Sequence, residues 1–191
     1  MPDPSFNPKS AIRNPQCAVG DQGDAMVIGY EAAAERIELE LGGKPAGAVL
    51  DIGCNTGAGM AALIIRWPHA ELYGIEPVSE FAHAARGKGL IVATARAESL
   101  PYGKGFFGLV FSRHSLEHVA DQEAAITEFH RVLRPGGHLY VQAPIEPAGS
   151  PNHLHESPFL SLGEFRNAFG LFDEIYFGPQ ETVAEFIGMK L

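Results

Sequence analysis

Residues 48–59 read Ala-Val-Leu-Asp-Ile-Gly-Cys-Asn-Thr-Gly-Ala-Gly, and this stretch decides the fold. The apolar run at 48–52 predicts a short buried strand. The glycines after it permit a tight turn, and the apolar residues of 57–67, which precede Pro68, predict a helix. A strand that passes through a glycine-rich turn directly into a helix is typical of open α/β sheets, which bind ligands beyond the carboxyl ends of their strands.

The same alternation continues on both sides of this stretch. A four-residue apolar period predicts a helix over 24–41. Further strands are predicted at 72–75, 90–93, 107–112 and 138–142. Helices are predicted at 78–86 and after Asp121, which serves as N-cap for a helix that ends at the turn 134–137. Strands that alternate with helices predict a parallel sheet covered on both faces.

The last part of the chain departs from this alternation. A helix is predicted over 162–169, and strands over 172–177 and 183–187 are joined by a Gly-Pro-Gln turn. The two strands predict a hairpin, and therefore an antiparallel edge. The predicted fold class is α/β, with three layers built around a seven-stranded, mostly parallel sheet. Residues 1–24 are expected to form an irregular arm, and residues 25–191 a single domain.

Composition excludes several classes of partner. The chain has 191 residues, 14 Lys and Arg against 23 Asp and Glu, and a net charge of −9. Nucleic acid and anionic membrane surfaces both require a basic footprint, so we expect neither as partner. We find no run of about 20 apolar residues that predicts a membrane span and no secretion signal. Two cysteines make no disulfide framework, so we expect a reducing, cytoplasmic location.

A second acidic residue, Glu76, follows the strand at 72–75. A carboxylate there can accept hydrogen bonds from both hydroxyls of a ribose, so the loop and Glu76 together predict a nucleoside site. The alternative is a packing turn beside a solvated glutamate. A dinucleotide fingerprint requires glycine at the third and sixth positions from Gly53, where this chain has Asn55 and Ala58. Asn55 would crowd a pyrophosphate, so a smaller nucleoside is favoured.

Five ordered segments resemble the motifs of class I S-adenosylmethionine-dependent methyltransferases. Residues 49–57 resemble the glycine-rich motif I, and Gly74-Ile75-Glu76-Pro77 resembles the acidic motif after it. Three further segments resemble the later motifs of the family: 97–102 together with 107–110, 112–119, and 133–137. The likeness spans roughly 47–145 and is closest to the small type 11 group, which often acts on metabolites. It implies a Rossmann-like methyltransferase fold, with S-adenosyl-L-methionine as methyl donor and S-adenosyl-L-homocysteine as product.

The resemblance also implies a cofactor site. Its residues would be Asp51, Gly53, Cys54, Asn55, Thr56, Gly57, Glu76, Pro77, Arg96, Ala97, Glu98, Ser112 and Arg113. In this site 53–57 would line the methionine part of the cofactor, Asp51 would order the loop, and Glu76 would hold the ribose. Pro77 and Val78 would form an apolar wall, and the backbone at 112–113 would meet the amino group.

Two positions depart from the family pattern. Asn55 replaces the usual middle glycine, and Arg96 stands where many members have an aspartate that accepts from the adenine amine. Because arginine has no acceptor, we expect that contact to move to Glu98 or to the backbone at Ala97.

Methyl transfer from a sulfonium requires alignment more than a catalytic side chain, because the cofactor carries the activated group. If a general base exists, His114 at the end of the fourth strand is the first candidate, and His118 is interpreted as part of a structural turn. The long segment 144–158 contains His153, His155 and Glu156, which could act as base, contact the acceptor or bind a divalent metal. The alternative is a solvated loop without a role in the reaction. Without a third distant ligand these residues are a weak metal signal, and no metal site is predicted.

The sequence therefore predicts a cytoplasmic methyltransferase that acts on a small or modest-sized acceptor. One alternative is a non-catalytic S-adenosylmethionine-binding regulator or partner subunit. Another is a nucleotide-dependent oxidoreductase, which Asn55 and Ala58 disfavour.

Overall fold

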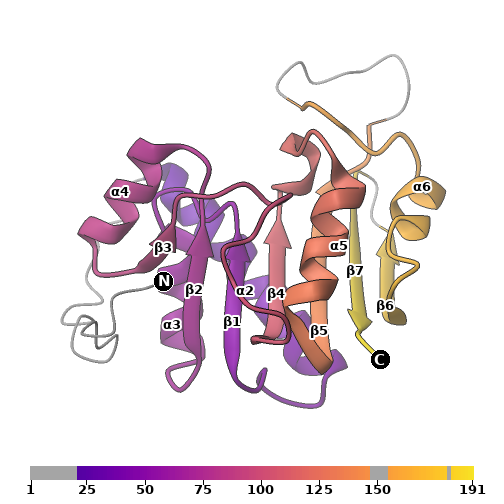
Figure 1. The fold of residues 1–191 in the computed structure, drawn as a ribbon, viewed down its shortest axis with the longest axis horizontal. Helices are drawn as coiled ribbons and strands as arrows, with labels where there is room; N and C mark the ends of the chain where they lie inside the picture. Colours follow the sequence, from indigo (N-terminus) through magenta and orange to yellow (C-terminus); the bar gives the residue numbers. More distant parts are fainter. Residues whose placement is uncertain (1–20, 147–154, 180–181) are drawn as a thin grey trace.

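The computed structural model of the chain describes residues 21–146, 155–179 and 182–191. These residues form a seven-stranded sheet in the order β3-β2-β1-β4-β5-β7-β6 (Figure 1). The strands are β1 (Ala48–Ile52), β2 (Glu71–Ile75), β3 (Ile91–Ala93), β4 (Phe107–Arg113), β5 (Leu133–Pro144), β6 (Asp173–Pro179) and β7 (Val183–Met189). The first five are parallel, and β7 runs antiparallel between β5 and β6. The predicted fold class and edge hairpin are confirmed.

Helices cover both faces of the sheet. They are α2 (Asp21–Glu40), α3 (Ala58–Arg66), α4 (Ser79–Gly87), α5 (Gln122–Val132) and α6 (Leu162–Asn167), with a 3₁₀ turn η1 (Leu116–His118) after β4. Alternate residues of each strand point to opposite faces, so Val49 packs with α2, α3 and α4 whereas Leu50 packs with α5 and α6. Figure 1 shows α5 in front of β4 and β5, with α2 behind the sheet. The result is three layers with an apolar core on each side.

Most predicted boundaries shift by only a few residues, and two differences have a structural reason or change an assignment. Helix α2 begins at Asp21 rather than Asp24, so residues 21–24, which were expected in the arm, are helical. The expected turn at 134–137 was wrong, because these residues lie within β5. Gly136 has a φ of 70° and donates to the carbonyl of Lys190, while the Lys190 amide donates to Gly137. Hydrogen bonds with the residue after β7 therefore keep 134–137 in an irregular part of strand β5. The rest of the expected arm, residues 1–20, lies outside the described residues.

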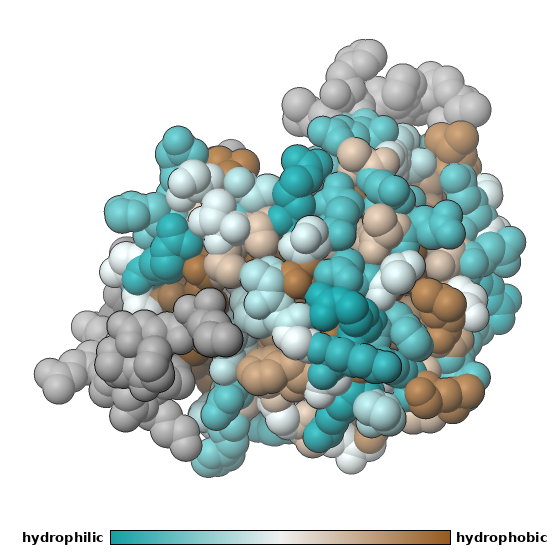
Figure 2. Space-filling model, in the orientation of Figure 1, coloured by the Kyte–Doolittle hydropathy of each residue, from teal (hydrophilic) through white to brown (hydrophobic). Residues whose placement is uncertain are grey.

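The surface in the view of Figure 2 is mostly hydrophilic, and apolar residues gather there in small separate patches rather than in one broad area. Within the described ranges, no helix combines the length and the apolarity that a bilayer span requires.

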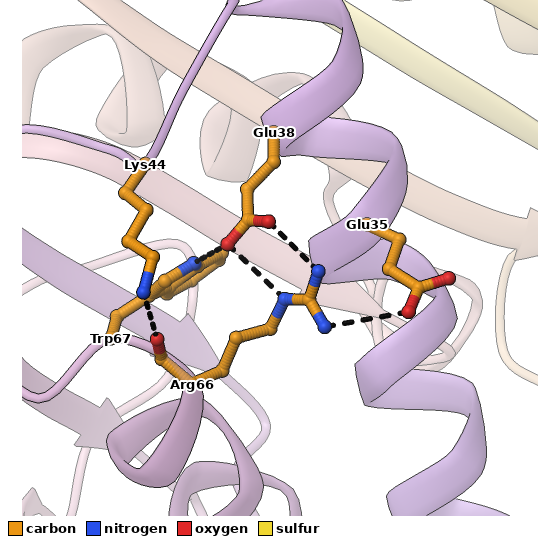
Figure 3. Close-up of polar contacts among 5 residues, drawn as sticks. All are labelled: Glu35, Glu38, Lys44, Arg66 and Trp67. Carbon is orange, nitrogen blue, oxygen red and sulfur yellow. Dashed lines mark hydrogen bonds and ion pairs between the residues drawn. The ribbon is translucent and has the colours of Figure 1, made fainter.

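A polar latch joins α2 to the end of α3 (Figure 3). Glu38 accepts hydrogen bonds at 2.8 Å from the Arg66 guanidinium and from the indole N–H of Trp67, a side chain that is 2% exposed. Lys44 donates to the Arg66 carbonyl at 2.8 Å. The hydrogen bonds from Arg66 lower the pKa of Glu38. The latch therefore holds the C-terminal part of α2 against the C-terminal end of α3.

Replacing Glu38 with alanine should lower the free energy of unfolding by about 1–2 kcal/mol, because the buried Trp67 N–H would lose its acceptor. Glu40→Ala is the matched control in the same helix. Glu40 forms only a half-exposed pair with Arg36, so its loss should cost less than about 0.5 kcal/mol. Urea denaturation of both variants measures the difference, and equal losses would show that the latch adds nothing to the ordinary surface pair.

Candidate ligand-binding cavity

A cavity of about 390 Å³ lies at the carboxyl ends of β1, β2 and β4. This volume is in the range of pockets for small ligands. The cavity brings together eight of the residues predicted as cofactor or catalytic contacts: Gly53, Asn55, Glu76, Pro77, Arg96, Ala97, Glu98 and His114. Seven other residues also line the cavity: Ile52, Ile75, Val78, Phe81, Ser115, His118 and Val119. The expected edge of the sheet is therefore the edge that carries the cavity.

The glycine-rich loop is held by its neighbours on two sides. The Gly53 and Cys54 amides both donate to the Ile75 carbonyl at 3.0 Å. On the other side, Ser115 Oγ donates to the Ile52 carbonyl at 2.7 Å. Gly53 has a φ of 70°, and a Cβ there would lie 2.5 Å from Ser115 Oγ. A glycine is therefore required at this point by backbone conformation and by space.

Asn55 adopts the left-handed backbone with a φ of 51°. Its side-chain oxygen accepts a hydrogen bond from the Thr56 amide at 2.6 Å, a local bond that supports this conformation. Asparagine is thus accommodated where related motifs have glycine, and its side chain folds back onto the loop.

Glu76 is the best-fixed polar group on the cavity wall. Its side chain is held by the Asn55 amide, which donates to Oε2 at 2.9 Å, and by the Val78 amide, which donates to Oε1 at 2.9 Å. The residue is only 6% exposed. Each carboxylate oxygen retains a second lone pair, so both can accept from a ligand in a preset orientation.

Asp51 lies behind the loop rather than on the cavity wall. It is fully buried, and the Tyr30 hydroxyl lies 3.1 Å from each of its carboxylate oxygens. Burial raises the pKa of Asp51 to about 8, although the hydrogen bond from Tyr30 opposes the shift and the charge of Glu76 adds to it. Tyr30 was missed by the sequence analysis, because only the fold brings α2 over β1.

Other predicted cofactor residues also lie away from the wall. Cys54 is buried against Gly74, and burial raises the pKa of its thiol. The Thr56 carbonyl accepts from Lys88 at 2.9 Å, and Gly57 forms the N-cap of α3. Ser112 is buried in β4, and the Arg113 guanidinium lies over the Tyr30 ring at 5.9 Å. These side chains do not line the cavity, so the predicted contacts at 112–113 could come only from backbone.

The opposite end of the cavity combines an apolar wall with a charged pair. Val78 and Phe81 lie on this wall, and Arg96 is 3.4 Å from Glu98. Phe81 was missed by the sequence analysis. Its position three residues after Val78 places the two side chains on one helical face, which is the signal that could have identified it.

Two histidines border the cavity from the turn after β4. His114 has a φ of 47°, its amide donates to the Gln142 carbonyl, and its Nδ1 lies 3.5 Å from Glu117 Oε1. His118 belongs to η1, the structural turn expected there, yet its side chain also lines the cavity. Ser115 and Val119 complete this side.

The candidate catalytic histidines of the segment after β5 were not found on the cavity wall within the described residues. His155 does not line the cavity, and its Nδ1 lies 2.5 Å from Glu146 Oε1. Its ring meets the His118 ring at 4.8 Å between centroids, edge to face. His153 lies outside the described residues.

The cavity therefore has a fixed carboxylate near a left-handed loop, an apolar wall, and imidazoles at its far side. The carboxylate suits a diol such as ribose, the wall suits a planar base, and the imidazoles can move a proton. The residues present thus fit a nucleoside-containing ligand.

Comparison with known proteins gives the same indication. A methyltransferase-domain family model matches residues 50–141. The malonyl-[acyl-carrier protein] O-methyltransferase of Herminiimonas arsenicoxydans is 35% identical over 118 residues, which are 62% of this chain and 45% of that protein. This chain spans about half the length of the curated relatives it matches.

Two solved structures illustrate the likeness in fold. A methyltransferase of Thermotoga maritima, described as a possible histamine N-methyltransferase, has a TM-score of 0.66 at 21% identity, over 85% of this chain and 89% of that one. The phosphoethanolamine N-methyltransferase 2 of Haemonchus contortus, solved with S-adenosyl-L-methionine, has a TM-score of 0.71 at 13% identity, over 84% of this chain and 52% of that one.

Proposed function

The chain belongs to the class I S-adenosylmethionine-dependent methyltransferases, and from this premise we propose that it transfers a methyl group from S-adenosyl-L-methionine to a small acceptor. The observation that carries the proposal is Glu76, a buried carboxylate fixed by two backbone amides beside the left-handed loop at Asn55. A carboxylate in this setting binds a ribose diol without reorganisation, which is the recognition that a nucleoside cofactor requires.

S-adenosylmethionine supplies, when bound, a methyl group on a sulfonium that is already activated for transfer. Glu76 would hold the ribose, Val78 and Phe81 would contact the base, and the loop at 53–55 would line the methionine part. These contacts fix the position of the donor end of the cavity. Alignment of this kind contributes up to about 7–11 kcal/mol to a transfer reaction.

His114 and His118 would lie on the acceptor side of the cavity. His114 Nδ1 lies 3.5 Å from Glu117 Oε1, a contact that orients the imidazole beside the cavity. His114 is therefore suited to accept a proton from an acceptor that enters protonated. Such a base contributes about 10²–10⁴-fold and is dispensable for an acceptor that is already a nucleophile.

A small acceptor rather than nucleic acid is supported by the net charge of −9, because binding to a phosphate backbone requires a basic surface. The Herminiimonas relative acts on an acyl group carried by a protein, so an acceptor presented by a carrier is a second candidate of modest size. We also propose a reducing, cytoplasmic location, in which a buried free thiol such as Cys54 is stable.

The proposal is tested first by ligand-induced stabilisation. S-adenosyl-L-homocysteine at about 100 times its dissociation constant should add about 2.7 kcal/mol of stability, or roughly 5–10 °C in Tm for a chain of this size. NAD should add nothing, because Asn55 and Ala58 leave little room for a pyrophosphate. The reverse result would favour a nucleotide-dependent oxidoreductase.

Turnover separates an enzyme from a binding protein. The chain is incubated with methyl-labelled donor and a metabolite extract, and the product that gains one methyl group is identified by mass. Label in a compound, lost when the cavity is blocked by S-adenosyl-L-homocysteine, supports catalysis. Stabilisation by this ligand without label in any fraction favours the non-catalytic regulator or partner subunit.

A further inference from the structure

Three side chains from two segments meet beside the cavity. Glu117 and His118 belong to η1, and His155 belongs to the segment after β5. One potential ligand atom from each lies within 4.8 Å of the other two. We propose that these residues bind a divalent transition-metal ion, Zn²⁺ in the first instance, at the rim of the acceptor side.

The strongest indication is the state of Glu117. The residue is only 1% exposed, and within the part of the chain that the structure describes its Oε2 has no hydrogen-bond partner. An unsatisfied buried oxygen of a carboxylate costs free energy that proteins rarely leave uncompensated. A bound cation supplies the missing partner.

The second indication is the orientation of His155. Glu146 Oε1 lies 2.5 Å from its Nδ1, so in a metal-bound neutral imidazole Nδ1 would donate to this carboxylate and Nε2 would be the ligand atom. A carboxylate that orients a histidine through its other ring nitrogen is the usual outer contact of a metal-binding imidazole. The edge-to-face contact of His155 with His118 brings the second imidazole to the same place.

The backbone explains why these segments meet. The Ser157 amide donates to the Glu117 carbonyl at 3.1 Å, two residues beyond His155. Gln122 Nε2 donates both to the Leu116 carbonyl at 3.1 Å and to the Ser157 carbonyl at 2.7 Å. Three hydrogen bonds thus hold the segment after β5 against η1. The cluster is therefore part of the fold and does not depend on a chance contact between exposed side chains.

The ligand set selects the metal. Two imidazoles and one carboxylate favour Zn²⁺, Co²⁺ or Ni²⁺ over Mg²⁺ and Ca²⁺, which prefer oxygen ligands. In a tetrahedral site with bonds of about 2.0–2.1 Å, ligand atoms stand about 3.3 Å apart. The ligand atoms lie within 4.8 Å of one another, so they have to approach by up to about 1.5 Å when the ion binds.

Three protein ligands leave an open coordination position, as in catalytic rather than structural zinc sites. His118 also lines the cavity, so the ion would be accessible to the acceptor. This part rests on the proposed function, and it narrows the acceptor to compounds that offer an oxygen or sulfur ligand close to the atom that receives the methyl group.

The test is zinc binding by the full chain without an affinity tag, after removal of metal by a chelator. Isothermal titration with Zn²⁺ should show one site per chain. His118→Asn and His155→Asn each remove a metal ligand and should weaken zinc binding by about 100-fold or more. Glu146→Gln removes only the partner that orients His155, so it should weaken zinc binding by about 10–100-fold. His69→Asn is the matched control, because His69 is an exposed histidine in the turn before β2, at the opposite edge of the sheet.

His155→Asn is also tested for binding of S-adenosyl-L-homocysteine, and its affinity should remain within about twofold of the parent chain because His155 does not line the cavity. Zinc binding that is absent, or that is unchanged in both histidine variants, overturns the metal site. Failure of the nucleoside to bind overturns the proposed function and leaves the zinc result standing, so the two failures are distinct.

Discussion

Replacing Glu76 with alanine is expected to weaken binding of S-adenosyl-L-homocysteine by about 1.5–3 kcal/mol, or roughly 10- to 150-fold in Kd. The carboxylate is held by the Asn55 and Val78 amides, so it meets a ribose diol without a conformational cost of its own. Its removal takes away the ligand contact and also frees the Asn55 amide, which loosens the loop. Isothermal titration measures the affinity.

The control for this variant is Glu80→Ala, which removes an exposed carboxylate from the first turn of α4 and should leave Kd within about twofold. Glu76→Gln is a second comparison, because the amide keeps one acceptor oxygen for a backbone donor while losing the charge. An affinity for Glu76→Ala equal to that of the parent chain would remove Glu76 from the nucleoside site.

The second large effect concerns pH and Asp51. Burial raises the pKa of this carboxyl to about 8 in the folded chain, whereas in the unfolded chain it ionises near pH 4. Between these values the folded state holds a proton that the unfolded state has released, so stability falls as pH rises. We expect Asp51 to contribute a loss on the order of 4 kcal/mol between pH 5 and pH 8, at up to about 1.4 kcal/mol per pH unit.

Asp51→Asn should remove this dependence, because the amide is uncharged and its oxygen still accepts from the Tyr30 hydroxyl. Urea denaturation at a series of pH values gives the difference in unfolding free energy between variant and parent. As the pH rises from 5 to 8, the variant should become steadily more stable relative to the parent. Asp173→Asn, at an exposed position in β6, is the control and should give a constant difference. If the unfolding free energies of Asp51→Asn and of the parent chain changed with pH in parallel, Asp51 would already be ionised in the folded chain and its raised pKa would be refuted.

The sheet was predictable because its strands carry local signals. Strand β1 has the predicted bounds, and the hairpin of β6 and β7 follows from two apolar runs around a Gly-Pro-Gln turn. The turn at 134–137 failed for the opposite reason. Its glycines signal a turn, but hydrogen bonds with Lys190, more than fifty residues away, keep the backbone in β5. Long-range pairing of this kind has no trace in a local window.

The cavity was located correctly in outline, and its contents were only partly predictable. Glu76 and the loop follow strand ends, so the sequence places them at one edge of the sheet. Which side chains face the ligand depends on packing: Cys54 turns under Gly74, whereas Phe81 turns toward the cavity. The meeting of His155 with Glu117 depends on the hydrogen bonds of Gln122, which only the folded chain forms.

The order of the strands also has a consequence for how the chain is made. Strand β7 separates β5 from β6, although it follows both in the sequence. One edge of β5, an inner strand with buried residues on both faces, thus has no neighbour until 189 − 144 = 45 further residues have been added. At the usual synthesis rate of about 5–20 residues per second, this takes roughly 2–9 s. During this interval a nascent chain presents a row of unpaired backbone N–H and C=O groups along β5, so its yield in the cell should depend on chaperones that shield this edge until β7 emerges.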